Sequence, residues 1–260
     1  MRLDQSLVQR GLVPSRERAK EAILAGEITI NGIARRKPGY EASEADSIVL
    51  LKERSYVGRG YLKLQKALEA FPIEVSTKIC MDVGASTGGF TQLLLERGAQ
   101  KIFAIDVGTG QLAEILKADP RVINLEKTDF RTVKKEQIEL CAFAGIDVSF
   151  ISLKLILPNL FALLDENGQA VCLLKPQFET GKPVKHGIVK DQKEHIRVIT
   201  EVCEAARQEG FFCRGLTHSP VTGGDGNIEF LLDLTKSSKN CDMAINICEA
   251  VRLAWEELKA

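Results

Sequence analysis

The chain has 260 residues, of which 45% are hydrophobic, and its 35 Lys and Arg side chains balance its 35 Asp and Glu side chains at pH 7. Its longest uncharged apolar run falls well short of the roughly 20 residues that a membrane helix needs, and charged residues interrupt any apolar leader, so we expect a cytoplasmic protein without a membrane span. The seven cysteines are odd in number and include no C-x-x-C pair, which favours buried thiols over disulfides or a zinc site.

The first fifty residues predict a compact α/β module. Ser15 is the expected N-cap of its second helix, and Gly26 is the expected C-terminal stop. Asn31-Gly32 is the strongest short hairpin signal that a sequence can carry. The expected elements are, in chain order, two helices and three short strands over residues 3–12, 15–24, 27–30, 33–37 and 47–51.

This module is slightly basic, because residues 1–60 hold eleven Lys and Arg against eight Asp and Glu. Basic side chains on the second helix and beside the hairpin could form one surface that faces phosphates. An ordinary solvated face explains the charge equally well. The residues concerned are Arg16, Arg18, Lys20, Arg35, Arg36 and Lys37.

Three short patterns in the module resemble a known RNA-binding domain. They are Arg2-Leu3-Asp4, Ser15-Arg16-x-x-Ala19 and Gly26-x-Ile28-x-Ile30-Asn31-Gly32, and they are similar to the small domain first described in a ribosomal protein of the small subunit. The resemblance implies an RNA-binding domain over residues 1–52, followed by a linker over residues 53–60. It implies RNA contacts by Arg2 and the six basic residues above, and we add Arg59 beyond them.

From Tyr61 to the end of the chain, apolar segments alternate with helical patterns. We expect helices between most of the strands and a final helix from about Cys241 to Leu258. This alternation predicts an α/β fold, a Rossmann-like doubly wound sheet of seven strands that binds ligands at the carboxyl ends of its strands. The strands are expected near residues 78–83, 101–106, 121–125, 144–149, 169–175, 211–217 and 228–235.

A glycine-rich turn follows the first of these strands. The run Asp82-Val83-Gly84-Ala85-Ser86-Thr87-Gly88-Gly89-Phe90 spaces its glycines G-x-x-x-G-G, whereas a dinucleotide fold uses G-x-G-x-x-G. Asp82 would also repel a pyrophosphate. Asp106 ends the next strand, where an acidic residue typically holds ribose hydroxyls. A nucleoside cofactor with a cation and no phosphate suits both carboxylates, so we expect S-adenosylmethionine and methyl transfer. The alternative is a tight turn that binds nothing.

Four ionisable residues are expected at the same edge of the sheet. Lys63 lies on a helix before the first strand, Asp147 ends the fourth strand, Lys175 ends the fifth, and Glu229 follows a glycine-rich turn. Any one of them could be an ordinary surface charge. Lys175 differs, because its strand is apolar and its charge therefore needs a partner.

Together the four residues resemble the Lys-Asp-Lys-Glu tetrad of FtsJ-type ribose 2′-O-methyltransferases. With the N-terminal domain, nearly the whole chain resembles the TlyA family, which comprises cytidine 2′-O-methyltransferases of ribosomal RNA that are also called haemolysins. The motifs that carry this resemblance are Arg59-Gly60-Tyr61-Leu62-Lys63-Leu64, Asp82 to Phe90, Asp147-Val148-Ser149-Phe150-Ile151-Ser152-Leu153, Leu174-Lys175-Pro176-Gln177-Phe178-Glu179 and Gly226-Asn227-Ile228-Glu229-Phe230.

The resemblance implies that the chain methylates ribosomal RNA, within an assembled or assembling subunit, without a metal. Asp129 would contact adenine, and Asp147 would lie near both the methionine moiety and the hydroxyl. The full set of expected cofactor residues is Asp82, Gly84, Ala85, Ser86, Gly88, Gly89, Phe90, Asp106, Val107, Asp129 and Asp147.

Lys175 is the expected centre of catalysis. A ribose hydroxyl is a poor nucleophile near neutral pH, so its proton must leave and the developing alkoxide must be stabilised. As a base Lys175 would have to be neutral, whereas Asp147 and Glu229 favour its charged form. We therefore favour a charged Lys175 that orients the hydroxyl, with direct proton abstraction as the alternative. Lys63 and Glu229 would complete the hydrogen-bond network.

Two other function classes stay open at this point. One is a membrane-active haemolysin, although no amphipathic or spanning segment supports it. The other is an RNA-binding protein whose methyltransferase fold is inactive. Among the remaining residues, the basic stretch 180–190 either closes over RNA or forms a solvated loop, and we expect structural roles for His195, His218 and Trp255.

Overall fold

The computed structural model describes the whole chain except residues 14, 52–55, 239–244 and 259–260, and it divides the chain into two compact units, Met1–Ser55 and Tyr56–Ala260. Part of the expected linker, residues 53–55, therefore lies outside the described residues. So does the start of the expected C-terminal helix, residues 241–244. Each unit is described by itself below.

In the N-terminal unit, two helices and a three-stranded antiparallel sheet share one apolar core. The helices are α1 (Leu3–Gln9) and α2 (Arg16–Ala25), and the sheet has the order β2-β1-β3, with bounds Ile33–Ala34, Ile28–Ile30 and Ile48–Leu50. Leu3, Leu7 and Ile23 of the helices pack with β1 in this core.

Local turn chemistry explains the boundaries of these elements. Ser15 caps α2 by accepting a hydrogen bond from the backbone N–H of Arg18, and Gly26 ends it in the left-handed conformation. Asn31 and Gly32 both have positive φ, which is the geometry of a type I′ hairpin turn. The first helix ends at Gln9, three residues earlier than expected.

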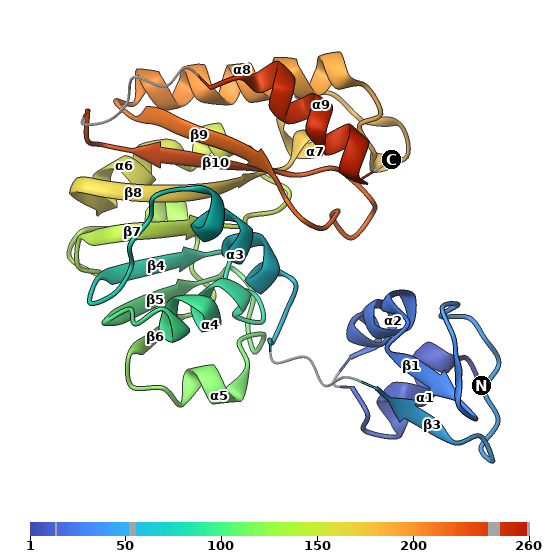
Figure 1. Cartoon of the computed structure of the whole chain (residues 1–260). Helices are drawn as coiled ribbons and strands as arrows, with labels where there is room; N and C mark the ends of the chain where they lie inside the picture. The colour runs from blue at the N-terminus through green and yellow to red at the C-terminus, as the bar shows by residue number, and fades with distance from the viewer. Residues whose placement is uncertain (14, 52–55, 239–244, 259–260) are drawn as a thin grey trace. The chain divides into compact units, whose positions relative to one another are not determined.

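The second unit is built on a seven-stranded sheet of the order β6-β5-β4-β7-β8-β10-β9. Figure 1 shows these strands side by side. Strands β4 to β8 run parallel, whereas β10 is antiparallel to both of its neighbours. The predicted fold class is confirmed. The strands are β4 (Ile79–Val83), β5 (Lys101–Ile105), β6 (Val122–Leu125), β7 (Cys141–Ile146), β8 (Leu164–Leu174), β9 (Phe212–His218) and β10 (Phe230–Thr235).

Helices cover both faces of this sheet, as the alternation of buried residues along β4 requires. Met81 and Val83 pack with α6, α8 and α9, whereas Cys80 packs on the opposite face with α3 and α4. Five of the six described cysteines are buried as free thiols. The helices are α3 (Gly60–Ala70), α4 (Gly89–Glu96), α5 (Glu114–Lys117), α6 (Leu157–Leu163), α7 (Pro176–Glu179), α8 (Gln192–Gln208) and α9 (Ile247–Leu258), with short 3₁₀ turns η1 (Phe130–Thr132), η2 (Leu153–Leu155) and η3 (Lys185–Gly187).

The register of the strands brings distant residues to one edge of the sheet. Val83, at the end of β4, is opposite Ile146, at the end of β7, so Asp147 follows directly beyond the sheet. Leu174, at the end of β8, is opposite Phe230, at the start of β10. Lys175 and Glu229 are the next residues beyond this pair, and pairing therefore places them at the same edge.

Candidate active site

The structure brings the four predicted tetrad residues into one cluster. Lys63 Nζ lies 2.8 Å from Glu229 Oε2 and 3.6 Å from Asp147 Oδ2. Lys175 Nζ lies 2.6 Å from Asp147 Oδ1 and donates a 2.8 Å hydrogen bond to Ser149 Oγ. Asp147 thus bridges two ammonium groups, and four groups from four separate elements form one charged network.

This network is nearly closed to water and has equal numbers of positive and negative groups. Both lysines are 7% exposed and Glu229 is 2% exposed. Burial opposes the charge of Lys63, but the carboxylates of Asp147 and Glu229 outweigh it and raise the pKa of Lys63. Burial likewise opposes the charge of Asp147, but Lys63 and Lys175 lower its pKa. Lys63 and Asp147 therefore each favour the ionised form of the other.

Two glycines allow the backbone and the carboxylates to come close. Gly84 has a φ of +82°, and a Cβ on it would lie 2.4 Å from the carbonyl oxygen of Asp147. A Cβ on Gly223 would lie 2.7 Å from Glu229 Oε1, although the backbone of Gly223 is not in the left-handed region. The carboxylate of Glu229 is thus seated against a position where only glycine fits without displacement.

Gly223→Ala is expected to lower the catalytic rate by roughly 10- to 100-fold, because a displacement of about 1 Å in a catalytic group has an effect of that order. The added methyl group would displace the carboxylate of Glu229 from Lys63. Gly224→Ala is the matched control, since its nearest contact would be an ordinary 3.6 Å from Arg59. Turnover of the two variants under saturating substrates is the measurement, and equal rates would contradict the expectation.

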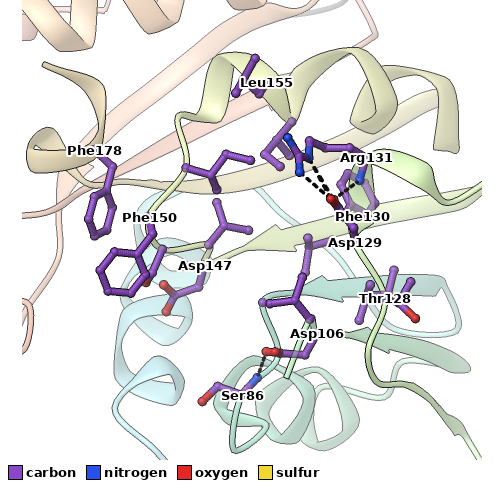
Figure 2. Close-up of a pocket in the computed structure, with 18 of the residues that line it drawn as sticks. Ser86, Asp106, Thr128, Asp129, Phe130, Arg131, Asp147, Phe150, Leu155 and Phe178 are labelled. Carbon is purple, nitrogen blue, oxygen red and sulfur yellow. Dashed lines mark hydrogen bonds and ion pairs between the residues drawn. The ribbon is translucent and has the colours of Figure 1, made fainter. Parts of the chain in front are cut away.

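A cavity of about 810 Å³ opens beside the tetrad. Figure 2 shows Asp106 and Asp147 on its wall. Asp106 Oδ2 accepts a hydrogen bond from the backbone N–H of Ser86, and its Oδ1 accepts one from Gly108. The predicted cofactor residues that line the cavity are Gly84, Ser86, Asp106, Val107, Asp129 and Asp147.

Asp82 occupies a different place from the one expected. Its side chain is 1% exposed, and its Oδ2 accepts hydrogen bonds from the backbone N–H and the hydroxyl of Thr91, on α4. Burial raises its pKa to about 7. Asp82 therefore ties the glycine-rich turn to α4 and does not line the cavity. Four other residues of the expected set are also absent from the cavity lining, Ala85, Gly88, Gly89 and Phe90.

Asp129 lines the cavity, but Arg131 already occupies its carboxylate. Nε of Arg131 donates to both carboxylate oxygens, and Nη2 donates to Oδ2 at 2.5 Å, as Figure 2 shows. These bonds lower the pKa of Asp129. An adenine amino group would have to share the carboxylate with this guanidinium.

Sequence reasoning missed several residues of the segment after β7. Ser149 contacts Lys175, and Phe150 lines the cavity with 91% of its surface exposed and a φ of +62°. Its ring lies 5.1 Å from that of Phe178. The hydroxyl in Asp-Val-Ser was a usable signal for Ser149, because it follows the strand-end carboxylate by two residues. Nothing in the local sequence indicates positive φ at a phenylalanine.

Three aromatic residues have the structural surroundings that we expected. His195 is fully buried, its Nδ1 accepts a hydrogen bond from Trp255 Nε1, and burial lowers its pKa to about 4. His218 contacts Glu257 through Nε2. These contacts join α8 and β9 to α9. Neither histidine is part of the tetrad.

The basic stretch 180–190 is tied to the turn that precedes Glu229. Asn227 is 1% exposed, its Oδ1 accepts from the backbone N–H of Val189, and its Nδ2 donates to the carbonyl of Gly187. The stretch is thus fastened at its C-terminal end, close in sequence to α8.

In the N-terminal unit, two of the predicted RNA contacts share one buried carboxylate. Asp4 is fully buried and accepts from Arg2 Nε at 3.0 Å and from Arg16 Nη2 at 3.1 Å. These bonds outweigh its burial and lower its pKa to about 2. The guanidinium of Arg35 lies over the ring of Tyr40. Of the other predicted RNA contacts in this unit, Arg18 contributes its backbone to the cap of α2, Lys20 and Lys37 are exposed, and the side chain of Arg36 donates to the carbonyl of Leu24. In the second unit, the side chain of Arg59 donates to the carbonyl of Thr222.

Comparison with known proteins gives two family matches. Residues 56–236 match the FtsJ-like methyltransferase family, and residues 1–48 match the S4 domain.

Three relatives cover most of the chain. A candidate rRNA methyltransferase of Bacillus subtilis, YqxC, is 48% identical over 90% of this chain and 85% of its own length. The 16S/23S rRNA (cytidine-2′-O)-methyltransferase TlyA of Mycobacterium tuberculosis is 41% identical over 98% of this chain and 97% of its own length. A solved structure of a candidate haemolysin from Streptococcus thermophilus is 42% identical, has a TM-score of 0.80 and covers 100% of this chain and 97% of its own.

Proposed function

The chain belongs to the FtsJ-like methyltransferase family, and on that premise we propose that it transfers a methyl group from S-adenosylmethionine to the 2′-hydroxyl of a cytidine ribose in ribosomal RNA. The observation that carries this proposal is the position of Asp147. It lines the cavity and also bridges Lys63 and Lys175. A methyl donor in the cavity and a hydroxyl at the tetrad would therefore meet at one residue.

The residues of the cavity fit S-adenosylmethionine better than a phosphorylated cofactor. Asp106 and Asp147 present carboxylates to the cavity, which suit ribose hydroxyls and a cationic methionine moiety and would repel phosphates. A volume of about 810 Å³ is ample for such a nucleoside. When bound, S-adenosylmethionine supplies a methyl group on a positively charged sulfur, which is a good leaving group. Val107 and Asp129 would contact its base.

Lys175 would act on the ribose hydroxyl. Its ammonium group is held by Asp147 and Ser149, so it can donate a hydrogen bond toward a hydroxyl that enters from the open side and stabilise the negative charge that develops on the oxygen. A neutral Lys175 could instead take the proton, but it would first lose its 2.6 Å ion pair with Asp147. We therefore favour the charged form. Lys63, which pairs with Glu229, would help to keep Asp147 in place.

We expect RNA contacts in each of the two units. In the S4 domain, Arg2 and Arg16 stay about half exposed while Asp4 fixes their direction, which suits contacts to phosphate oxygens. Because A-form RNA is recognised mainly by shape and backbone, the basic residues of this domain would hold the substrate without reading much sequence. Arg59 would add a contact at the start of α3.

Phe150 is the side chain of the second unit best placed to hold a target base. Single unstacked RNA bases stack on exposed aromatic rings, and such a contact contributes about 1–3 kcal/mol per base. Phe150 follows Ser149, the residue that contacts Lys175. Its side chain is 91% exposed, and its ring contacts the ring of Phe178.

Phe150→Ala is expected to lower kcat/KM for ribosomal RNA by at least about tenfold, which corresponds to the lower half of that stacking range. Phe150→Tyr should retain most of the activity, because it keeps the ring. Steady-state methylation of the preferred RNA substrate is the measurement. If the alanine variant matched the wild type, Phe150 would have no role in holding the base.

The test of the function itself is methylation with methyl-labelled S-adenosylmethionine. The substrates are intact 30S subunits, intact 50S subunits and naked ribosomal RNA, each assayed separately. Label recovered as 2′-O-methylcytidine after complete nuclease digestion supports the proposal and shows which particle is the substrate. Label on a base or on protein, or no label on any of the three substrates, would refute it.

The other two function classes have less support. In the part of the chain that the structure describes, no helix is long and apolar enough to cross a membrane, and nothing in the site suggests a lytic activity. An inactive methyltransferase fold is disfavoured because three ion pairs join the four charged groups of the tetrad in one chain, Glu229–Lys63–Asp147–Lys175.

A further inference from the structure

Glu179 is a buried carboxylate that lies four residues after Lys175 and has no place in the tetrad. It is 3% exposed. Its Oε2 accepts a 2.5 Å hydrogen bond from Ser152 Oγ, and its Oε1 accepts a 2.7 Å hydrogen bond from the backbone N–H of Leu153. Burial raises the pKa of Glu179, and these two bonds oppose the rise. A carboxylate is costly to bury, and both hydrogen bonds that offset this cost come from one short segment of the chain.

That segment, residues 147–153, carries much of the proposed active site. At its start, the backbone N–H of Asp147 donates to the carbonyl of Val83, on β4. In its middle, Ser149 contacts Lys175. At its end, the bonds to Glu179 hold it to α7, which begins directly after Lys175. The segment is thus fastened at both ends, and its far end depends on Glu179.

Phe150 needs such fastening because its backbone is strained. A φ of +62° at a phenylalanine costs on the order of 1–3 kcal/mol and persists only where the surrounding structure enforces it. The ring is 91% exposed, so burial of the ring does not supply the enforcement. The constraints that the structure shows are the bonds at the two ends of the segment, the hydrogen bond between Lys175 and Ser149 and the contact of the ring with Phe178.

Glu179 itself is not placed to touch a substrate. It is absent from the cavity lining, whereas its neighbours in the network, Ser152 and Phe178, are part of it. Both of its oxygens already accept hydrogen bonds from the segment. Any effect on catalysis must therefore pass through the residues that it holds.

We propose that Glu179 is a positioning residue for the methylation reaction, which clamps the far end of segment 147–153 and thereby keeps the ring of Phe150 in the orientation that receives the target nucleotide. This inference rests on the proposed function. The carboxylate is suited to the task because it only accepts hydrogen bonds, and Ser152 and Leu153 each supply a donor. Glutamine could satisfy Leu153 but could not accept from Ser152 with the same arrangement.

The kinetic test compares three variants with the wild type in the full-length protein. Glu179→Ala is expected to lower kcat by about 30-fold, in the range that a displacement of about 1 Å produces, while S-adenosylmethionine affinity, measured by calorimetry, stays within about threefold. Glu179→Gln should recover much of the rate. Glu201→Gln is the matched control, because this carboxylate lies in the same neighbourhood but pairs with Lys154 and Arg197 and should leave kcat unchanged.

A double-mutant cycle separates positioning from general damage to the fold. If Glu179 acts through Phe150, adding Glu179→Ala to Phe150→Ala should lower kcat by less than about threefold, because coupled residues are not additive. A full 30-fold loss in that background would overturn the proposal, and so would rates within threefold of the wild type for Glu179→Ala. If the alanine variant does not fold, the same cycle is run with Glu179→Gln, whose expected loss is smaller but must again vanish without Phe150.

Hydrogen exchange, measured without RNA or cofactor, tests the clamp independently of activity. Glu179→Ala should speed exchange at the backbone N–H groups of residues 149–153 at least about tenfold, Glu179→Gln should speed it less because it can still accept from Leu153, and exchange in β7 should not change. If the wild type methylates no RNA but this change occurs, the proposed function fails and the clamp stands. If exchange is unchanged, the clamp fails whatever the activity.

Discussion

Lys175→Met is expected to lower methyl transfer to ribosomal RNA by about 100- to 1000-fold, the usual loss when one donor that stabilises a developing oxyanion is removed. Methionine keeps most of the length of the side chain and removes the ammonium group that contacts Asp147 and Ser149. Because Lys175 is not part of the cavity lining, the affinity for S-adenosylmethionine should stay within about threefold. Single-turnover methylation with saturating cofactor measures the rate.

The controls for this prediction distinguish charge from position. Lys175→Arg keeps the positive charge but replaces a compact ammonium by a planar fork in a buried site, so we expect it to remain strongly impaired. Lys154→Met removes a lysine from the neighbouring η2 that pairs only with Glu201 among the described ion pairs, and its rate should match that of the wild type. A Lys175→Met variant that retained more than a tenth of the wild-type rate would refute the proposed role.

Asp147→Asn is expected to combine a loss of activity with a loss of stability. Asp147 lies between two buried ammonium groups, and removing its charge leaves Lys175 without a carboxylate partner among the described ion pairs, while Lys63 retains Glu229. Breaking a buried pair in this way typically costs about 3–5 kcal/mol. We expect a clearly lower melting temperature and methylation reduced at least about 100-fold, because the hydroxyl would then meet a displaced Lys175.

The difference in melting temperature between the wild type and Asp147→Asn should depend on pH, because the pKa of Asp147 is lowered in the folded protein. A carboxylate whose pKa is lower in the folded state contributes stability above its unfolded pKa, near 3.9, and loses it as the pH falls through the folded value. The difference in melting temperature between the wild type and Asp147→Asn should therefore be full at pH 6–7 and shrink below about pH 4. Lys63, whose pKa is raised, contributes throughout this range and loses its contribution only at strongly alkaline pH.

Asp119→Asn is the matched control, since Asp119 is an aspartate that pairs with Arg121 at the surface. Exposed pairs contribute at most about 1 kcal/mol, so this variant should melt close to the wild type at every pH. If Asp147→Asn also melted like the wild type at pH 7, the two ammonium groups would not depend on Asp147, and the bridging role assigned to it would be wrong.

Most of the secondary structure could be predicted because it depends on local signals, and the four tetrad residues could be named because their motifs resemble those of a known family. The cap at Ser15, the hairpin at Asn31-Gly32 and the alternation of strands and helices are each visible within a few residues. Strand ends were less certain: β7 ends at Ile146, three residues before the expected end, and β8 begins at Leu164, five residues before the expected start. A run of apolar residues does not show where pairing with a neighbour starts or stops.

Several site residues could not be placed from the sequence, because their roles depend on what packs over them. Asp82 lies one residue before the end of β4 and Asp106 directly after β5, yet only Asp106 lines the cavity, since Thr91 on α4 satisfies the carboxylate of Asp82. Phe150 looks like a core residue in sequence and is exposed in the structure. Glu179 looks like a surface charge and is buried.

The sequence by itself therefore determined the types and order of the elements, the sheet-edge position of Asp147 and Lys175, and the resemblance to a methyltransferase family, because periodicity and turn residues act over short distances. Only the tertiary structure decided that Lys63 reaches Glu229 across 166 positions of the chain, that Asp147 bridges two lysines, and that Glu179 fastens the segment that carries Phe150. Such contacts depend on strand order and register, which no local pattern specifies.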